Sequence, residues 1–196
     1  MKTEGNLRMT GTLTAKHIKA NIAHKSRISA LITRFRNAIH ALQGAAVIYA
    51  TLSAKHYISS ESRWIDLGII CRRVVTTEFV NFLVDELQAN QTRFNSFKHH
   101  GSGTSSVAEA VGDTVLGAET PETRAVGTQA EGASANIYRS VGTITYAAAR
   151  AIVEHGLFSA ASVPDELLDR SVFAVINVAT NDKIEFTYEL TCTAGG

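Results

Sequence analysis

The chain of 196 residues has only two cysteines, Cys71 and Cys192. Two thiols so far apart are too few for a disulfide framework or a zinc site. Cys192 continues the alternation of a C-terminal strand, so we expect a small buried thiol there. We therefore expect a chain that folds in a reducing cytoplasm and needs no metal or other cofactor.

Long apolar runs are also lacking. The longest, residues 45–52, falls far short of the roughly 20 residues that a membrane-spanning helix needs. The opening sequence MKTEGNLRMTGTLTAK contains no apolar segment of the kind found in secretory signals. We therefore expect no membrane association. Aromatic residues make up 7% of the chain and Trp64 is the single tryptophan, which argues against a sugar-binding platform.

Catalytic motifs are absent as well. The run Gly101-Ser102-Gly103-Thr104 lacks the Lys-Ser/Thr of a P-loop and the GxSxG spacing, so it predicts a flexible loop or turn. His99 and His100 would point to opposite faces of a strand and chelate one ion poorly. Glu154-His155 predicts a structural hydrogen bond, and Asp169-Arg170 a surface ion pair at a strand entrance. No set of catalytic roles can be assigned, so we predict that the chain is not an enzyme.

The net charge of +1 conceals a strong asymmetry along the chain. Residues 1–100 carry 14 basic and 6 acidic side chains, whereas residues 101–196 carry 5 and 12. The two halves therefore sum to +8 and −7, which together give +1. Either the surfaces are unremarkable, or opposite ends of neighbouring copies attract each other in an assembly.

Residues 14–43 have the pattern of an amphipathic helix, with Gly44 as a C-terminal stop. Its apolar positions are Ile28, Leu31, Ile32, Phe35, Ile39 and Leu42. The candidates for contact with a partner are Arg27, Arg34, Phe35, Arg36 and Leu42. The helix could instead dock on its own domain, or lie on a membrane surface or on nucleic acid. Nucleic acid is the weakest of these, because Phe35 is the only interleaved aromatic residue.

The remaining elements follow from residue type and turn signals. We predict strands over 45–58 and 64–75, a turn at 59–62 and a second helix over 78–89. We expect residues 90–123 to form a loop, either a mobile connection or an ordered contact loop, with a short strand over 94–99. A β-meander should follow, with strands near 124–130, 136–146, 150–158, 170–179 and 183–193.

The last predicted strand is the clearest, because Ile184, Phe186, Tyr188, Leu190 and Cys192 alternate with polar residues and should face inward. Residues 170–179 are apolar on both faces and should form a central strand, with a turn at 180–182. The pattern predicts an α+β fold that is mainly β: an antiparallel β-sandwich or jelly-roll-like module with an N-terminal amphipathic helix and one further helix. We expect residues 1–60 to be a basic helical arm with the first strand, and 61–196 the sandwich domain.

The segments EGASANIYRS and EHGLFSA resemble a family of small, largely uncharacterised virion structural proteins of tailed bacteriophages and prophages. The upstream segments RRVVTTEFVNFLVDELQ and FKHHGSGTSSVAEAVGDT are similar to the same family, so the resemblance covers about residues 64–196. EHGLFSA followed by LLDR also resembles, more loosely, a β-segment of tail-fibre and baseplate proteins. The resemblance brings no catalytic residues with it.

The resemblance implies a structural component of a phage particle, such as a capsid decoration or a neck or tail adaptor. Such a protein would assemble in the host cytoplasm, reside in the virion, and form homo-oligomers and contacts with major capsid or tail proteins, without specific nucleic-acid binding. The alternative is a receptor- or glycan-binding appendage similar to a tail fibre.

Overall fold

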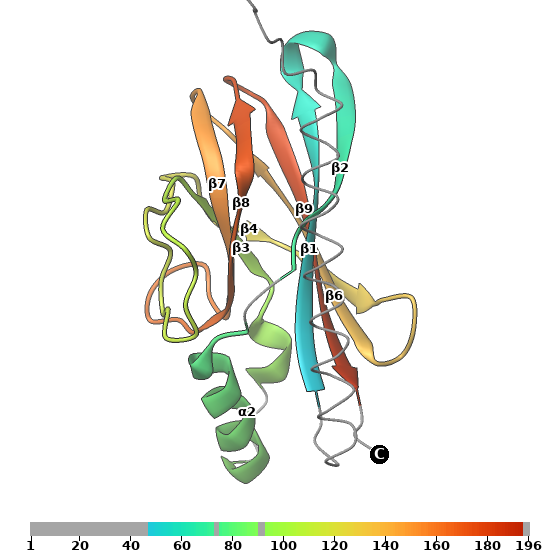
Figure 1. Ribbon diagram of the computed structural model, residues 1–196, viewed down its shortest axis with the longest axis vertical. Helices are drawn as coiled ribbons and strands as arrows, with labels where there is room; N and C mark the ends of the chain where they lie inside the picture. The colour runs from blue at the N-terminus through green and yellow to red at the C-terminus, as the bar shows by residue number, and fades with distance from the viewer. Residues whose placement is uncertain (1–46, 73–74, 90–92, 194–196) are drawn as a thin grey trace, which may run out of the picture. The chain divides into compact units, whose positions relative to one another are not determined.

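The computed structural model describes residues 47–72, 75–89 and 93–193 (Figure 1). These residues form two antiparallel sheets and one α-helix, which confirms the prediction of a mainly β, sandwich-like α+β fold. The predicted helix over 14–43 lies outside the described residues. β1 belongs to one of the two sheets although it falls in the predicted 1–60 region.

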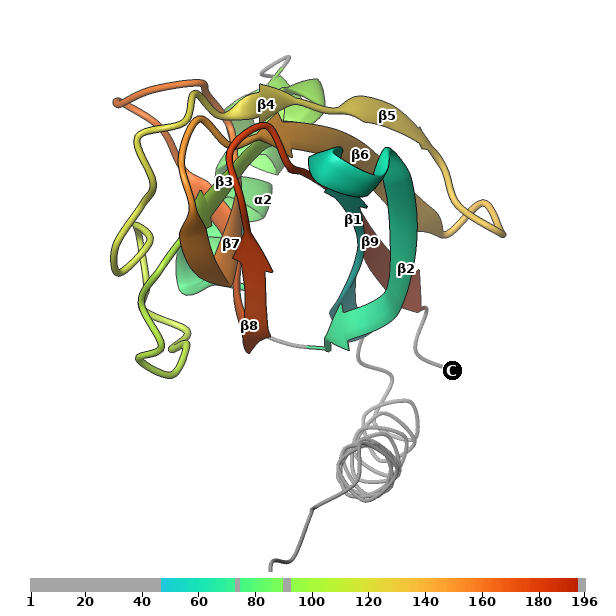
Figure 2. The same cartoon turned by 90° about the horizontal axis from the view of Figure 1, so that it is seen from above.

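The first sheet has five strands in the order β2-β1-β9-β6-β5. Their bounds are β1 (Val47–Ile58), β2 (Arg63–Cys71), β5 (Thr128–Glu131), β6 (Ile137–Thr145) and β9 (Lys183–Thr193). The second sheet has four strands in the order β4-β3-β7-β8. Their bounds are β3 (His99–Gly103), β4 (Ala125–Val126), β7 (Arg150–Phe158) and β8 (Leu167–Val178). The two sheets face each other, as Figure 2 shows.

The core lies between the sheets and confirms the predicted alternation along β9 as far as Leu190. Ile184, Phe186 and Tyr188 are wholly excluded from solvent, and Leu190 is buried. The expected buried thiol is wrong, because Thr191 is buried and Cys192 is exposed. The alternation ends at Thr191, which pairs with Ile137, the first residue of β6.

The predicted meander is wrong, because β6–β7 and β8–β9 are connections between the two sheets. Only β5–β6 and β7–β8 are hairpins of sequential strands in this part of the chain. β8 is therefore an edge strand and not the central strand that its apolar sequence predicts. Its apolar residues are therefore not all buried: Phe173 and Ile176 face the core, whereas Val175 is exposed.

The predicted turn at 180–182 is confirmed, although it connects two sheets. Asn181 has a left-handed backbone with φ of 67°, a conformation that asparagine tolerates well. The Asp182 carboxylate accepts hydrogen bonds from the backbone N–H groups of Ala179 (2.9 Å) and Ser59 (2.7 Å). It also lies 3.1 Å from Nε2 of His56, so one carboxylate joins this turn to the end of β1.

The second helix is confirmed as α2 (Thr77–Ala89). The Thr76 hydroxyl accepts a hydrogen bond from the backbone N–H of Phe79 (3.1 Å), which is the capping role expected of a threonine here. Phe79 and Phe82 are buried. Helical spacing would place Leu87 on the same apolar face, but Leu87 is 82% exposed, and the buried position there belongs to Glu86.

Two boundaries differ from the prediction. The short helix η2 (Arg93–Ser96) occupies most of the segment predicted as a strand over 94–99, and β3 begins only at His99. The predicted strand over 124–130 is two strands, β4 and β5, which belong to different sheets. The chain changes sheet at Gly127, where an added Cβ would collide with the side chains of Ser140 and His100. The turn predicted at 59–62 is confirmed by helix η1 (Ser59–Glu61).

Candidate functional site

The five predicted partner-contact residues, Arg27, Arg34, Phe35, Arg36 and Leu42, lie outside the described residues. The chemistry of the described part is instead concentrated in two polar networks that sequence reasoning did not find. The first is a histidine cluster between the sheets. The second is a set of ion pairs and hydrogen bonds that fastens the long connection after β3.

His100 on β3 is the centre of the first network. Its Nδ1 lies 2.9 Å from Nε2 of His155 on β7, and its Nε2 lies 2.8 Å from Oγ of Ser140 on β6. All three side chains are wholly excluded from solvent. The cluster therefore ties the two sheets together, and the described structure offers a substrate no access to it.

Burial keeps both rings neutral. It lowers the pKa of His100 to about 3, with a smaller contribution from the neighbouring His99. Burial also lowers the pKa of the fully enclosed His155 imidazole well below its ordinary value, and the His100 ring adds to this. Two neutral imidazoles can share one N–H···N hydrogen bond, whereas two charged ones would repel each other.

His99 and His100 are adjacent in the sequence, but the structure places their side chains in different surroundings. His99 is partly exposed, whereas His100 is enclosed, as expected for adjacent residues on a strand. Among the residues that the structure describes, no three His, Cys, Asp or Glu side chains form a group that could hold a metal ion. The predicted loop at Gly101-Ser102-Gly103-Thr104 is wrong, because its first three residues are buried in β3.

Three other buried polar atoms lie among the residues between the sheets. Nδ1 of His155, Oδ2 of Asp169 and Oη of Tyr188 have no hydrogen-bond partner among the described residues. Burial raises the pKa of the Asp169 carboxyl well above its ordinary value, although the Ser171 hydroxyl donates to its other oxygen (2.6 Å) and opposes this. Asp169 is therefore a buried group and not half of the surface ion pair that the sequence predicts.

The second network begins at Glu154 on β7 and Arg170 on β8. Their side chains are buried, with Glu154 wholly excluded from solvent, and Nη2 of Arg170 lies 2.7 Å from Oε2 of Glu154. The expected hydrogen bond between Glu154 and its neighbour His155 does not form, because the two point to opposite sides of β7. Glu154 instead binds Arg170 and the connection after β3, and His155 binds His100.

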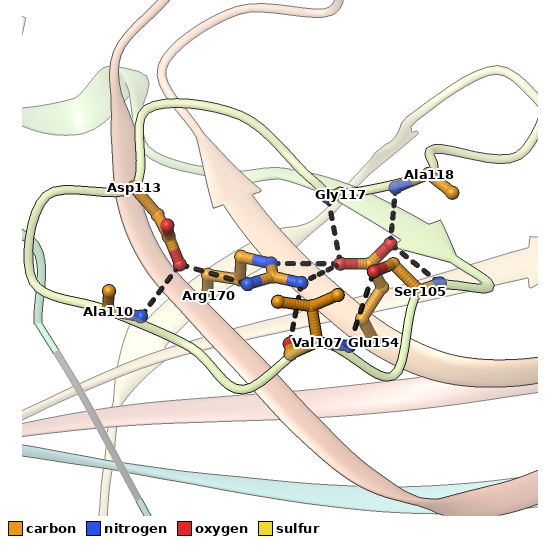
Figure 3. A network of polar contacts seen from close by, with 8 residues as sticks. All are labelled: Ser105, Val107, Ala110, Asp113, Gly117, Ala118, Glu154 and Arg170. Atoms are coloured by element: carbon orange, nitrogen blue, oxygen red, sulfur yellow. Dashed lines mark hydrogen bonds and ion pairs between the residues drawn. The ribbon is translucent and has the colours of Figure 1, made fainter.

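Figure 3 shows how this pair fastens the 104–118 loop. Glu154 accepts hydrogen bonds from the backbone N–H groups of Ser105 (3.1 Å), Gly117 (3.0 Å) and Ala118 (2.8 Å). It therefore joins the beginning of the loop to its end.

Arg170 fastens the middle of the same loop. Its Nη1 donates to the Asp113 carboxylate (3.0 Å), and its Nη2 donates to the backbone carbonyl of Val107 (3.1 Å). The same Asp113 oxygen accepts from the backbone N–H of Ala110 (2.8 Å). Beneath the loop, Leu116 packs with Phe158 and Leu167 in a small apolar cluster of its own.

Two more arginines fasten the segment that follows the loop. Arg124 pairs with Glu119 (2.6 Å) and Asp165 (2.5 Å), and its guanidinium lies 3.4 Å from the centre of the Phe158 ring. Arg150 pairs with Glu122 (3.0 Å). For residues 104–123 of the predicted 90–123 loop, these contacts therefore favour an ordered loop over a mobile connection.

The outer side of the 104–118 loop contrasts with its inner side. Val107, Val111 and Val115 are 70%, 60% and 58% exposed. The other exposed residues of the loop are Ala, Gly, Ser and Thr. Its two acidic residues, Glu109 and Asp113, are partly buried, and Asp113 is bound to Arg170. The loop therefore presents an uncharged, partly apolar surface above a base of buried charges.

Comparison with known proteins gives no match. No family model, no curated protein and no solved structure matches this chain. In the described part of the chain, no helix is both long and apolar enough to cross a membrane.

Proposed function

We propose that this chain is a structural component of a tailed-phage virion that acts through protein–protein contacts in a symmetric assembly. The observation that carries the proposal is the 104–118 loop. A loop longer than about 12–15 residues without secondary structure is uncommon in a compact domain, and such loops are usually functional or disordered. This loop is bound at both ends and in its middle, so an ordered contact role fits it best.

The buried charges beneath the loop support the same role. A buried ion pair adds little net stability, because desolvation of the two charges offsets their attraction. The Glu154–Arg170 pair is therefore better explained by the single geometry that it imposes on the loop than by the stability that it adds. Rigid display of a loop lowers the entropic cost of binding a partner, which suits repeated contacts in an assembly.

The sequence resemblance supports a phage virion as the assembly in which these contacts are made. The EGASANIYRS and EHGLFSA segments resemble phage virion proteins, and the basic N-terminal segment is the proposed contact with a major capsid, neck or tail protein. Within it, the candidates remain Arg27, Arg34, Phe35, Arg36 and Leu42. The chain would act without catalysis and reside in the virion.

Mass spectrometry of purified phage particles tests the proposal. We expect the chain among the virion proteins at a stoichiometry that matches a symmetric assembly. Replacing Arg27, Arg34 and Arg36 together with Glu should reduce its amount in particles while leaving the purified chain folded. Absence of the unmodified chain from mature particles would end this proposal.

A recognition module is the second candidate, because one surface feature favours it. Trp64 on β2 is 44% exposed and its ring lies 5.2 Å from that of Tyr57 on β1. The ammonium group of Lys183 lies 5.7 Å from the Tyr57 ring. Half-exposed aromatic rings beside polar groups can stack on a sugar. A glycan array with the purified chain and a Trp64→Ala control separates this function from the first, since a purely structural protein should bind no glycan.

A further inference from the structure

We propose that the 104–118 loop is a contact between two copies of this chain. This proposal rests on the proposed function, because it names one contact surface, and the partner that binds it, within the proposed assembly. The loop lies on the side of β7 and β8 away from the five-stranded sheet, as Figure 2 shows, so a second copy can approach it without disturbing the core.

The distribution of apolar side chains is the first argument. Among the described residues, six of the twelve exposed large hydrophobic side chains lie on the 104–118 loop and on α2. They are Val107, Val111 and Val115 on the loop, and Val80, Val84 and Leu87 on the helix. Apolar groups gathered on one part of a surface mark a contact site more often than single exposed ones do.

The helix and the loop are directly joined. The backbone N–H of Thr77, at the start of α2, donates to the carbonyl of Val111 (2.7 Å). Val80, Val84 and Leu87 follow at intervals of four and three residues, so they share one face of the helix. That face begins within one turn of the hydrogen bond that joins the helix to the loop.

Charge indicates which partner fits. Three acidic residues in or near the loop are each paired with an arginine: Asp113 with Arg170, Glu119 with Arg124, and Glu122 with Arg150. Glu109, the other acidic residue of the loop, is partly buried. A strongly charged partner would therefore gain little from ion pairs with the loop and would lose water from its own charges. A second copy presents the same uncharged surface, so a two-fold contact brings no like charges together.

The size of the surface sets the strength of the contact. A standard interface uses roughly 20–30 residues from each partner, and the loop with the exposed face of α2 provides about half of that number. We therefore expect a weak pair, with a Kd on the order of 0.1 mM, of the kind that becomes stable when several contacts act together in an assembly.

Sedimentation analysis of the full chain between about 5 µM and 1 mM tests the proposal. We expect the unmodified chain to dimerise reversibly and Val111→Asp to weaken the association at least tenfold, because it places two carboxylates opposite each other. Val115→Asp should act in the same direction. The matched control is Val163→Asp, which adds the same charge at a valine that is 75% exposed and lies outside the loop.

Each result bears on this proposal alone. A chain that stays monomeric at 1 mM overturns it, and so does an association that Val111→Asp and Val115→Asp leave unchanged. Circular dichroism of each variant checks that the fold is intact, as expected for substitutions at exposed positions. Since the virion role is tested by mass spectrometry of particles, a monomeric chain found in particles would refute the copy-to-copy contact and leave the proposed function in place.

Discussion

The buried histidine pair predicts a loss of stability in mild acid. An unfolded histidine has a pKa near 6.5, whereas burial lowers that of His100 in the folded chain to about 3. The folded state therefore binds fewer protons than the unfolded state between these values. Stability from His100 is fully present above pH 6.5 and falls as the pH drops below it.

The magnitude follows from the size of the shift. A pH of 5 is about 1.5 units below the pKa of an unfolded histidine, and each unit corresponds to about 1.36 kcal/mol of stability. His100 alone should therefore remove about 2 kcal/mol between pH 7.5 and pH 5. His155 is shifted in the same direction and adds to the loss.

One neighbour in the core acts in the opposite direction. The Asp169 carboxyl has a raised pKa, so the folded chain takes up a proton there as the pH falls, and this stabilises it. His99, beside His100, also has a pKa lowered by burial and therefore adds to the loss. The other polar groups around the two rings, Ser140 on β6, Ser171 on β8 and Tyr188 on β9, do not ionise in this range. The variant Asp169→Asn removes the opposing effect and should make the loss of stability in acid steeper.

Urea unfolding at pH 7.5, 6 and 5 measures the effect. We expect the free energy of unfolding to fall by about 2 kcal/mol or more between pH 7.5 and pH 5, and His100→Gln to flatten this dependence. Should His100→Gln not fold, NMR titration of the histidine ring signals in the unmodified chain provides the second test. Two rings should stay neutral down to pH 5, and titration of every histidine near pH 6.5 would refute the reasoning.

Three further predictions concern the loop and the core. Glu154→Gln should lower stability by about 3 kcal/mol, because it leaves a buried arginine without its charge partner, and should raise elastase cleavage in the 104–118 loop at least tenfold; equal cleavage rates would contradict the fastening role. Gly142→Ala should cost about 1–3 kcal/mol in thermal or urea unfolding, because its Cβ would meet the His100 ring at 2.5 Å. Tyr188→Asp should abolish folding, since it buries a charge, whereas Glu189→Lys should cost less than about 1 kcal/mol; equal tolerance in a circular dichroism melt would refute the strand register.

Sequence patterns predicted the elements best where the pattern is purely local. The bounds of β7 and β9 agree with their predicted ranges, and in β9 the alternation of apolar and polar residues marks the strand clearly. The pairing of strands was not predictable in the same way. β8 is apolar on both faces, a pattern that predicts a central strand, yet it lies at the edge of its sheet. The face of β8 that points away from the core is partly covered by the 104–118 loop, which Arg170 binds.

The polar networks were missed because each depends on residues far apart in the sequence. Ser140 and His155 meet His100 only when three strands of two sheets come together. One local signal was available: Gly127 and Gly142 leave room for the His100 ring, and glycines within or beside strands often mark a close approach. The sequence suggested a surface ion pair for Arg170 and a hydrogen bond to His155 for Glu154, because nothing local shows that a distant loop will cover both side chains.

The pairing of β1 with β9 has a consequence for how the chain folds during synthesis. β9 lies between β1 and β6, so the five-stranded sheet is incomplete until β9 has left the ribosome. His56 and Asp182, which meet across this pair, are 126 residues apart. Contacts between such distant residues form slowly, and until β9 arrives β1 and β6 each present an unpaired strand edge. We therefore expect the nascent chain to depend on chaperones that shield these edges, and a chain cut before residue 183 to aggregate.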